Sequence, residues 1–330
     1  MNYKSYKDLG DDVYANIHKL QGQGYDLVVG IPRSGMIPAY MIALLLNVYC
    51  VDIDSFVNNS KLVKGSTRKS SKFISSAWDA EKILLVDDSL RTGNSMQEAM
   101  QKIRSRVSQD VDRLAIYVEE SSLDGVDIYF EIVPGPRFFQ WNLFHHPILE
   151  RSCLELEGVL CVAPSEEELQ EESKYNEFLS TARPLVLPTY KIQTILTSRP
   201  ERYREQTETW LNKNNIEFEH LVMNEAVTSG EERPHECYAI YKADRYRASA
   251  SKLLIENSEE VARRMAEHSG KPVLCLAEGK IIQPGLASLA MHDRQRLARV
   301  TLKRCKRFLF LAMPEPVVTV IGKAYRKLFR

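Results

Sequence analysis

The sequence predicts an α/β protein with two doubly wound, mainly parallel-sheet domains and a basic C-terminal helical tail. In the first domain, apolar runs at residues 27–31 and 82–86 each lead through a short polar loop into a helical pattern. The same alternation restarts at residues 152–161, which predicts a second sheet. We expect the domains to span residues 1–150 and 151–282 and the tail to span residues 283–330.

The composition indicates an ordinary soluble globular chain. It has 330 residues, long enough for two domains, of which 44% are hydrophobic and 27% charged. No apolar run reaches the roughly 18 residues of a membrane span, and residues 1–20 lack the apolar region of a signal peptide. The six cysteines form no CxxC pair, which favours a reducing cytoplasm and no zinc site.

Around the two sheet-forming runs, the remaining elements of the first domain follow in order. Residues 1–25 are expected to form an amphipathic helical lead-in, and residues 36–46 an apolar helix. Residues 113–118 and 127–133 are expected to be further strands, which extends the alternation of strand and helix. Ligands of such sheets bind across the carboxyl ends of the strands.

Residues 82–95 are the stretch around which the first domain is organised. Four apolar residues, 83–86, run into the adjacent carboxylates of Asp87 and Asp88, and a polar loop with Gly93 precedes a helix start. A strand, turn and helix start of this kind surrounds an anion with backbone N–H groups and a positive helix end. The carboxylates suit ribose hydroxyls and hydrated Mg²⁺, which takes one or two carboxylates plus substrate oxygens.

This stretch resembles the signature of type I phosphoribosyltransferases: an apolar strand, two acidic residues, three variable residues, then Thr-Gly-x-Thr/Ser. The resemblance implies that phosphoribosyl pyrophosphate (PRPP) and Mg²⁺ bind here. Asp87 and Asp88 would hold the ribose hydroxyls and the metal, and residues 91–95 the 5-phosphate. Residues 33–35 would be the pyrophosphate loop. The expected PRPP-binding residues are Arg33, Ser34, Gly35, Lys72, Asp87, Asp88, Arg91, Thr92, Gly93, Asn94 and Ser95, with Arg33, Asp87 and Asp88 catalytic.

The polar stretch at residues 58–76 is long for a connection inside a compact domain, which is typical of a functional lid or a disordered segment. The resemblance implies a mobile loop that closes over PRPP and excludes water. Its candidate phosphate contacts are Lys64, Arg68, Lys69 and Lys72. A solvated loop with incidental basic side chains is the alternative.

Two features bear on the acceptor. Hypoxanthine-guanine phosphoribosyltransferases have an Asp just before the Thr-Gly, where it acts as a base toward the purine, whereas this chain has Arg91. A cation cannot accept a proton, which disfavours purine salvage. The aromatic run at residues 138–144 would cover the acceptor or pack in a core, and His145 and His146 favour an interface over a metal site.

The second domain resembles haloacid-dehalogenase-type phosphatases over residues 152–282. Residues 152–161 match the first motif, Asp-x-Asp-Gly followed by apolar residues, except that both Asp positions are Glu. Residues 195–199 resemble the second motif and residues 253–258 the acidic fourth, while residues 165–188 read as a solvated helical cap. The degenerate phosphatase site would comprise Glu155, Glu157, Thr197, Ser198, Lys242 and Glu256.

The two glutamates predict a phosphatase domain that has lost its activity. The family's first Asp attacks phosphorus and its second acts as acid and base. Glu adds a methylene, and a misplacement of about 1 Å costs on the order of 100-fold. The alternative is a weak phosphatase that acts on a 5-phosphoribosyl product.

The tail is strongly basic. Residues 283–330 hold 11 Lys/Arg against two acidic residues, so the rest of a chain with no net charge is acidic. Bases interleave with Leu and Phe over residues 294–330, a pattern typical of helices at anionic membrane surfaces. A packed helix and a nucleic-acid contact, the latter disfavoured, are the alternatives.

Together, these features predict a Mg²⁺- and PRPP-dependent transferase that moves 5-phosphoribose onto a hydroxyl of a lipid-linked glycan, with loss of pyrophosphate, in ribofuranose-containing polysaccharide synthesis. The enzyme would be cytoplasmic, peripheral at the inner face of the membrane. One alternative is a nucleobase phosphoribosyltransferase resembling the orotate enzymes. Another is a PRPP-sensing regulator that binds nucleic acid.

Overall fold

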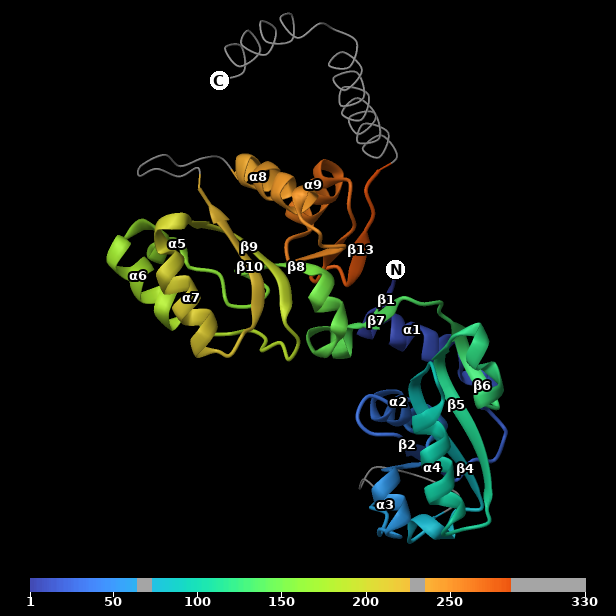
Figure 1. Ribbon diagram of the computed structural model, residues 1–330. Coiled ribbons are helices and arrows are strands. Elements are labelled where there is room, and N and C mark those ends of the chain that lie inside the picture. Colours follow the sequence, from blue (N-terminus) through green and yellow to red (C-terminus); the bar gives the residue numbers. More distant parts are fainter. Residues whose placement is uncertain (64–72, 226–234, 286–330) are drawn as a thin grey trace, which may run out of the picture. The chain divides into compact units, whose positions relative to one another are not determined.

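The computed structural model describes residues 1–63, 73–225 and 235–285 (Figure 1). The chain divides into two compact units, Met1–Ile148 and Leu149–Arg330. The expected lid residues Lys64, Arg68, Lys69 and Lys72 lie outside the described residues, as does the tail from residue 286 onward. No helix within the described ranges is long and apolar enough to cross a membrane.

The first unit is built on a five-stranded sheet in the order β3-β2-β4-β5-β6, in which every pairing is parallel (Figure 1). Its strands are β2 (Leu27–Gly30), β3 (Tyr49–Asp52), β4 (Lys82–Leu90), β5 (Asp110–Val118) and β6 (Ile128–Ile132). Its helices are α1 (Tyr6–Asn16), α2 (Met36–Leu46), α3 (Ile53–Val57) and α4 (Asn94–Arg104). The α/β fold with a parallel sheet that the sequence predicts for this unit is confirmed.

Helices cover both faces of this sheet, which is why its central strand is apolar on both sides. Ile83 and Leu85 of β4 belong to a buried cluster that includes residues of α3 and α4. Leu84 and Val86, which point to the opposite face, pack in a second cluster with residues of α1 and α2. A parallel strand buried on both faces reads as a continuous apolar run, as β4 does.

The N-terminal residues depart from the expected helical lead-in. Residues Asn2–Lys4 form a strand, β1, which pairs in parallel with β7 (Arg137–Phe139) in a separate two-stranded sheet. The α1 helix begins only after Ser5, which forms a capping box with Asp8. The pairing of β1 with β7 joins the start of the unit to the aromatic segment near its end.

The second unit contains a six-stranded sheet in the order β10-β9-β8-β11-β12-β13, parallel except for β13. Its strands are β8 (Ser152–Glu155), β9 (Ile192–Pro200), β10 (Phe218–Asn224), β11 (Leu253–Glu256), β12 (Val273–Cys275) and β13 (Lys280–Ile282). Its helices are α5 (Glu166–Gln170), α6 (Glu172–Thr181), α7 (Arg204–Lys213), α8 (His235–Ala248) and α9 (Glu259–Ser269). The segment expected to form a helical cap thus contains α5 and α6.

Candidate active site

The loop that follows β2 lies against the carboxyl-terminal part of β4. The β2 and β4 strands pair up to Gly30 and Val86, and the amide of Ile31 donates a hydrogen bond of 2.9 Å to the Val86 carbonyl. A Cβ atom on Gly35 would lie 2.9 Å from Oδ1 of Asp87. The structure therefore brings Gly35, the last residue of the predicted pyrophosphate loop, next to Asp87.

The acidic pair is buried, and this burial disfavours the ionised form of Asp87. Asp87 and Asp88 are only 7% and 5% exposed, and the Asp88 amide donates to Oδ1 of Asp87 at 2.9 Å. Burial, together with the charge of Asp88, raises the pKa of Asp87 to about 8. A divalent cation would relieve this repulsion, and a pair of carboxylates completed by substrate oxygens is a donor set that suits Mg²⁺. Across the described ranges, no group of three or more Asp, Glu, His and Cys side chains could hold a metal on its own.

The predicted phosphate loop joins β4 to α4. Its residues from Arg91 to Ser95 are exposed or partly exposed, and α4 begins at Asn94 behind Gly93. Gly93 has φ of 80°, a left-handed conformation that favours glycine. The Ser122 hydroxyl donates to the Arg91 carbonyl at 2.7 Å and so ties the loop to the rest of the unit. The exposed start of α4 presents N–H groups suited to an anion.

The aromatic segment contains a contact to the acidic pair that the sequence analysis missed. The indole N–H of Trp141 donates to Oδ2 of Asp88 at 2.7 Å, while Phe138 and Phe139 are buried in the unit. Beside it, Arg137 donates to the Leu90 carbonyl at 2.6 Å. A partly buried indole N–H needs an acceptor, but the sequence does not indicate which one.

His146 and Arg91 are close enough for their charges to interact. Burial, with the nearby positive charge of Arg91, lowers the pKa of His146. The ring of His146 also lies 6.3 Å from that of Phe138, and its Nδ1 accepts from the Ile148 amide at 3.1 Å. The charge of Arg91 therefore disfavours the protonated form of His146.

Replacing Gly35 with Ala is expected to impair PRPP turnover, because the new methyl group would lie 2.6 Å from the Ile31 carbonyl and 2.9 Å from the Asp87 carboxylate. A displacement of about 1 Å of the Gly35 loop or of Asp87 would reduce kcat/KM on the order of 100-fold. Steady-state pyrophosphate release measures this loss. Gly10→Ala is the matched control: it meets only the Met41 side chain at 3.8 Å and should leave turnover unchanged. Equal activity of both variants would contradict a functional role for the close packing of Gly35 against Asp87.

In the second unit, the residues predicted for the degenerate phosphatase site converge at the carboxyl ends of neighbouring strands. Lys242 of α8 forms an ion pair with Glu155 of β8, and its Nζ lies 3.5 Å from Oε2 of Glu256 in β11. All three side chains are buried. Burial raises the pKa of Glu155, and the adjacent charge of Lys242 opposes this shift and favours the ionised carboxylate of the ion pair.

Glu157, the second glutamate of the altered first motif, is paired with a different basic residue. The Glu157 carboxylate pairs with Arg199 and accepts a hydrogen bond from the Thr197 hydroxyl at 2.9 Å. Arg199 is 2% exposed and also donates to the Thr207 hydroxyl at 3.2 Å. Ser198 is partly exposed beside them on β9. Arg199 stands in the motif noted in the sequence, but its partner did not follow from the spacing.

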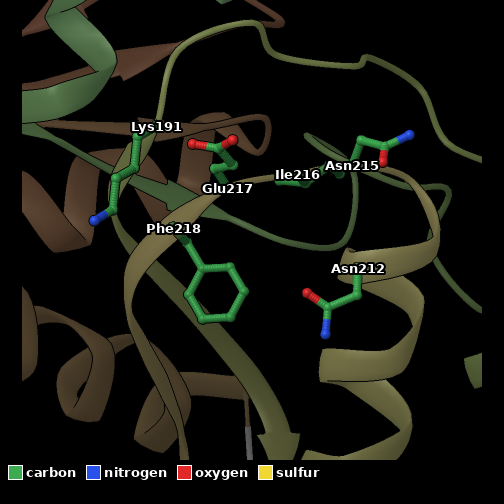
Figure 2. A pocket seen from close by; sticks show the side chains of 6 residues that line it. All are labelled: Lys191, Asn212, Asn215, Ile216, Glu217 and Phe218. Carbon is green, nitrogen blue, oxygen red and sulfur yellow. The ribbon is translucent and has the colours of Figure 1, made fainter.

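A separate open pocket of about 520 Å³ lies at the other end of this sheet. Its lining comes from α7, from the loop that follows it, and from the starts of β9 and β10 (Figure 2). The lining residues are Lys191, Asn212, Asn215, Ile216, Glu217 and Phe218. The pocket thus lies at the amino ends of the strands, whereas Thr197 and Glu155 lie toward their carboxyl ends.

Comparison with known proteins identifies the first unit. A model of the phosphoribosyl transferase domain matches residues 2–145. A xanthine-guanine phosphoribosyltransferase of Idiomarina loihiensis is 24% identical over 132 residues, which cover 39% of this chain and 79% of that protein. A purine phosphoribosyltransferase structure from Pyrococcus horikoshii is 18% identical, with a TM-score of 0.32, and the match covers 42% of this chain and 92% of that one. An orotate phosphoribosyltransferase structure from Aeropyrum pernix is 20% identical, with a TM-score of 0.26, and the match covers 38% of this chain and 70% of that one. Residues 2–145 are a phosphoribosyl transferase domain, and the predicted enzyme class, a phosphoribosyltransferase, is confirmed.

Proposed function

We propose that the first unit transfers 5-phosphoribose from PRPP to a nucleobase in a Mg²⁺-dependent reaction. The observation that carries this proposal is the contact between the Gly35 loop and the buried Asp87–Asp88 pair. Residues 33–35 would hold the pyrophosphate, the acidic pair the ribose hydroxyls and Mg²⁺, and the backbone N–H groups of residues 91–95, with the hydroxyls of Thr92 and Ser95, the 5-phosphate. When bound, Mg²⁺ would neutralise charge shared between the carboxylates and the pyrophosphate.

In this reaction the bond between C1 of the ribose and the pyrophosphate oxygen breaks, and that oxygen keeps the electron pair. A ring nitrogen of the base forms the new bond to C1 and gives its proton to solvent. Positive charge develops on the ribose and negative charge on the departing pyrophosphate, so the site must stabilise both electrostatically. The buried carboxylates would face the positive charge on the ribose, and Arg33 with the amides of its loop would face the negative charge on the pyrophosphate.

The acceptor is proposed to be a nucleobase because the matched relative is named for xanthine and guanine. At the position where purine-salvage enzymes carry an Asp, Arg91 offers only hydrogen-bond donors. A base that presents carbonyl or carboxylate oxygens, such as xanthine or orotate, complements that side chain. The glycan acceptor predicted above depended on the tail, which lies outside the described residues, and none of the relatives named above is described as acting on a glycan.

For the second unit we propose a haloacid-dehalogenase-like domain without phosphatase activity. The order β10-β9-β8-β11-β12 and the meeting of Glu155, Lys242 and Glu256 support this interpretation. Each glutamate of the altered first motif is paired with a protein cation, Lys242 or Arg199. Glu155→Asp combined with Glu157→Asp should raise Mg²⁺-dependent phosphatase activity, whereas appreciable activity in the unaltered chain would contradict the proposal.

The decisive test is pyrophosphate release from PRPP by the full chain with Mg²⁺, assayed with orotate, xanthine, guanine, hypoxanthine and a membrane extract that contains lipid-linked glycans. We expect pyrophosphate release with xanthine, with orotate or with both, and no release after chelation of the metal. Arg91→Asp should lower pyrophosphate release with these bases and raise release with hypoxanthine or guanine. Release with the glycan fraction alone would overturn the nucleobase proposal, and PRPP binding without release would identify a regulator.

A further inference from the structure

We propose that Trp141 is a positioning residue that holds the Asp88 carboxylate in place for the ribose of PRPP. This inference rests on the function proposed above, because it assigns a role within the same site. It concerns a residue that the PRPP motif does not contain, from a segment 53 positions further along the chain.

The contact is well defined. The indole N–H donates to Oδ2 of Asp88 at 2.7 Å, and Asp88 is 5% exposed. The amide of Asp88 donates in turn to Oδ1 of Asp87 at 2.9 Å. One oxygen of each carboxylate is thereby engaged by the protein, and Trp141 restrains the rotation of the Asp88 carboxylate.

The indole ring is itself held from several sides. The ring of Phe139 stacks on it with centroids 4.9 Å apart and an interplanar angle of 6°, and the Tyr6 ring lies at 5.7 Å. Tyr117 stacks on Phe139 at 5.4 Å, and its hydroxyl donates to Asp12 at 2.8 Å. Because β1 pairs with β7, the first residues of the chain help to fix this arrangement. Side chains whose rotamers are locked by packing are suited to orient others.

The choice of an indole has a chemical consequence. An Arg or Lys at this place would neutralise Asp88 and compete with a metal ion or with ribose hydroxyls. A Trp side chain supplies one directed donor and no charge. Trp141 therefore restrains the carboxylate without adding a charge of its own, which is the role of an outer partner that orients a ligating group.

The chain offers a matched control, since it has three tryptophans and the other two donate to backbone carbonyls. Trp78 is partly buried like Trp141 and donates to the Phe56 carbonyl at 2.8 Å, and Trp210 donates to the Ala182 carbonyl at 2.8 Å. Trp141→Phe and Trp78→Phe remove the same N–H and ring from the same unit. Only the first removes a contact to Asp88.

The first measurement is the ¹⁵N–¹H spectrum of the indole groups in the full chain. Trp141→Phe identifies the Trp141 signal by its disappearance. We expect Asp88→Asn and the addition of Mg²⁺ with PRPP to shift that signal and to leave those of Trp78 and Trp210 in place. A Trp141 signal that does not respond to Asp88→Asn would overturn the inference, whether or not the protein turns over PRPP.

The second measurement is kinetic. Trp141→Phe should lower kcat/KM for PRPP about 10- to 100-fold, the loss typical when the partner of a ligating group is removed, whereas Trp78→Phe should match the unaltered chain. Equal kinetics of both variants would refute the positioning role. An unaltered chain that releases no pyrophosphate with any acceptor would instead refute the proposed function, whereas the response of the Trp141 signal to Asp88→Asn does not depend on that function.

Discussion

Asp88→Asn is expected to reduce PRPP turnover on the order of 10²- to 10³-fold, the loss typical when one preorganised electrostatic partner of a transition state is removed. The amide keeps the shape of the side chain but lacks the negative charge that would face the ribose and the metal. Pyrophosphate release under saturating Mg²⁺ and PRPP measures the effect.

The same substitution separates a loss of function from a loss of fold. Asp88 is buried beside Asp87, and their mutual repulsion contributes to the raised pKa of Asp87. Removing one of two adjacent buried carboxylates should leave the melting temperature unchanged or raise it. Asp110→Asn, at the amino end of β5 with a largely exposed side chain, is the control and should affect neither property. Undiminished turnover by Asp88→Asn would remove Asp88 from the site.

Lys242→Met is expected to destabilise the second unit by about 3–5 kcal/mol, the cost of leaving a buried ion pair without one partner. Without its ammonium group, the carboxylates of Glu155 and Glu256 would be buried with no cation between them. In a background that carries Trp78→Phe and Trp141→Phe, both in the other unit, denaturant unfolding followed by the fluorescence of Trp210 reports on this unit. The single transition of one unit also avoids treating the whole chain as two-state.

Two further variants test whether the loss of stability comes from the unpaired buried charge. Lys242→Met combined with Glu155→Gln removes both charges of the closest pair, and should recover part of the lost stability. Lys174→Met breaks exposed ion pairs with Glu167 and Glu171 and should cost less than about 1 kcal/mol. If Lys242→Met cost no more than Lys174→Met, the buried cluster would not stabilise this unit.

Local sequence patterns were sufficient for the parts of the fold that depend on neighbouring residues. The apolar run before Asp87 predicts β4 because a strand covered on both faces needs apolar side chains on both. The Thr-Gly-x-Ser sequence after it predicts the turn and the start of α4, since these depend on backbone conformation within a few residues. The strands predicted at residues 113–118 and 127–133 likewise appear as β5 and β6.

Contacts between distant segments were decided by tertiary packing. The N-terminal strand β1 exists only because Arg137–Phe139 pairs with it, so nothing in residues 1–25 alone indicates it. Trp141 reaches Asp88 across 53 positions, and Arg199 reaches Glu157 across 42. A sequence lists the donors and the acceptors, but burial decides which of them must pair, because only the folded core removes the water that would otherwise satisfy them.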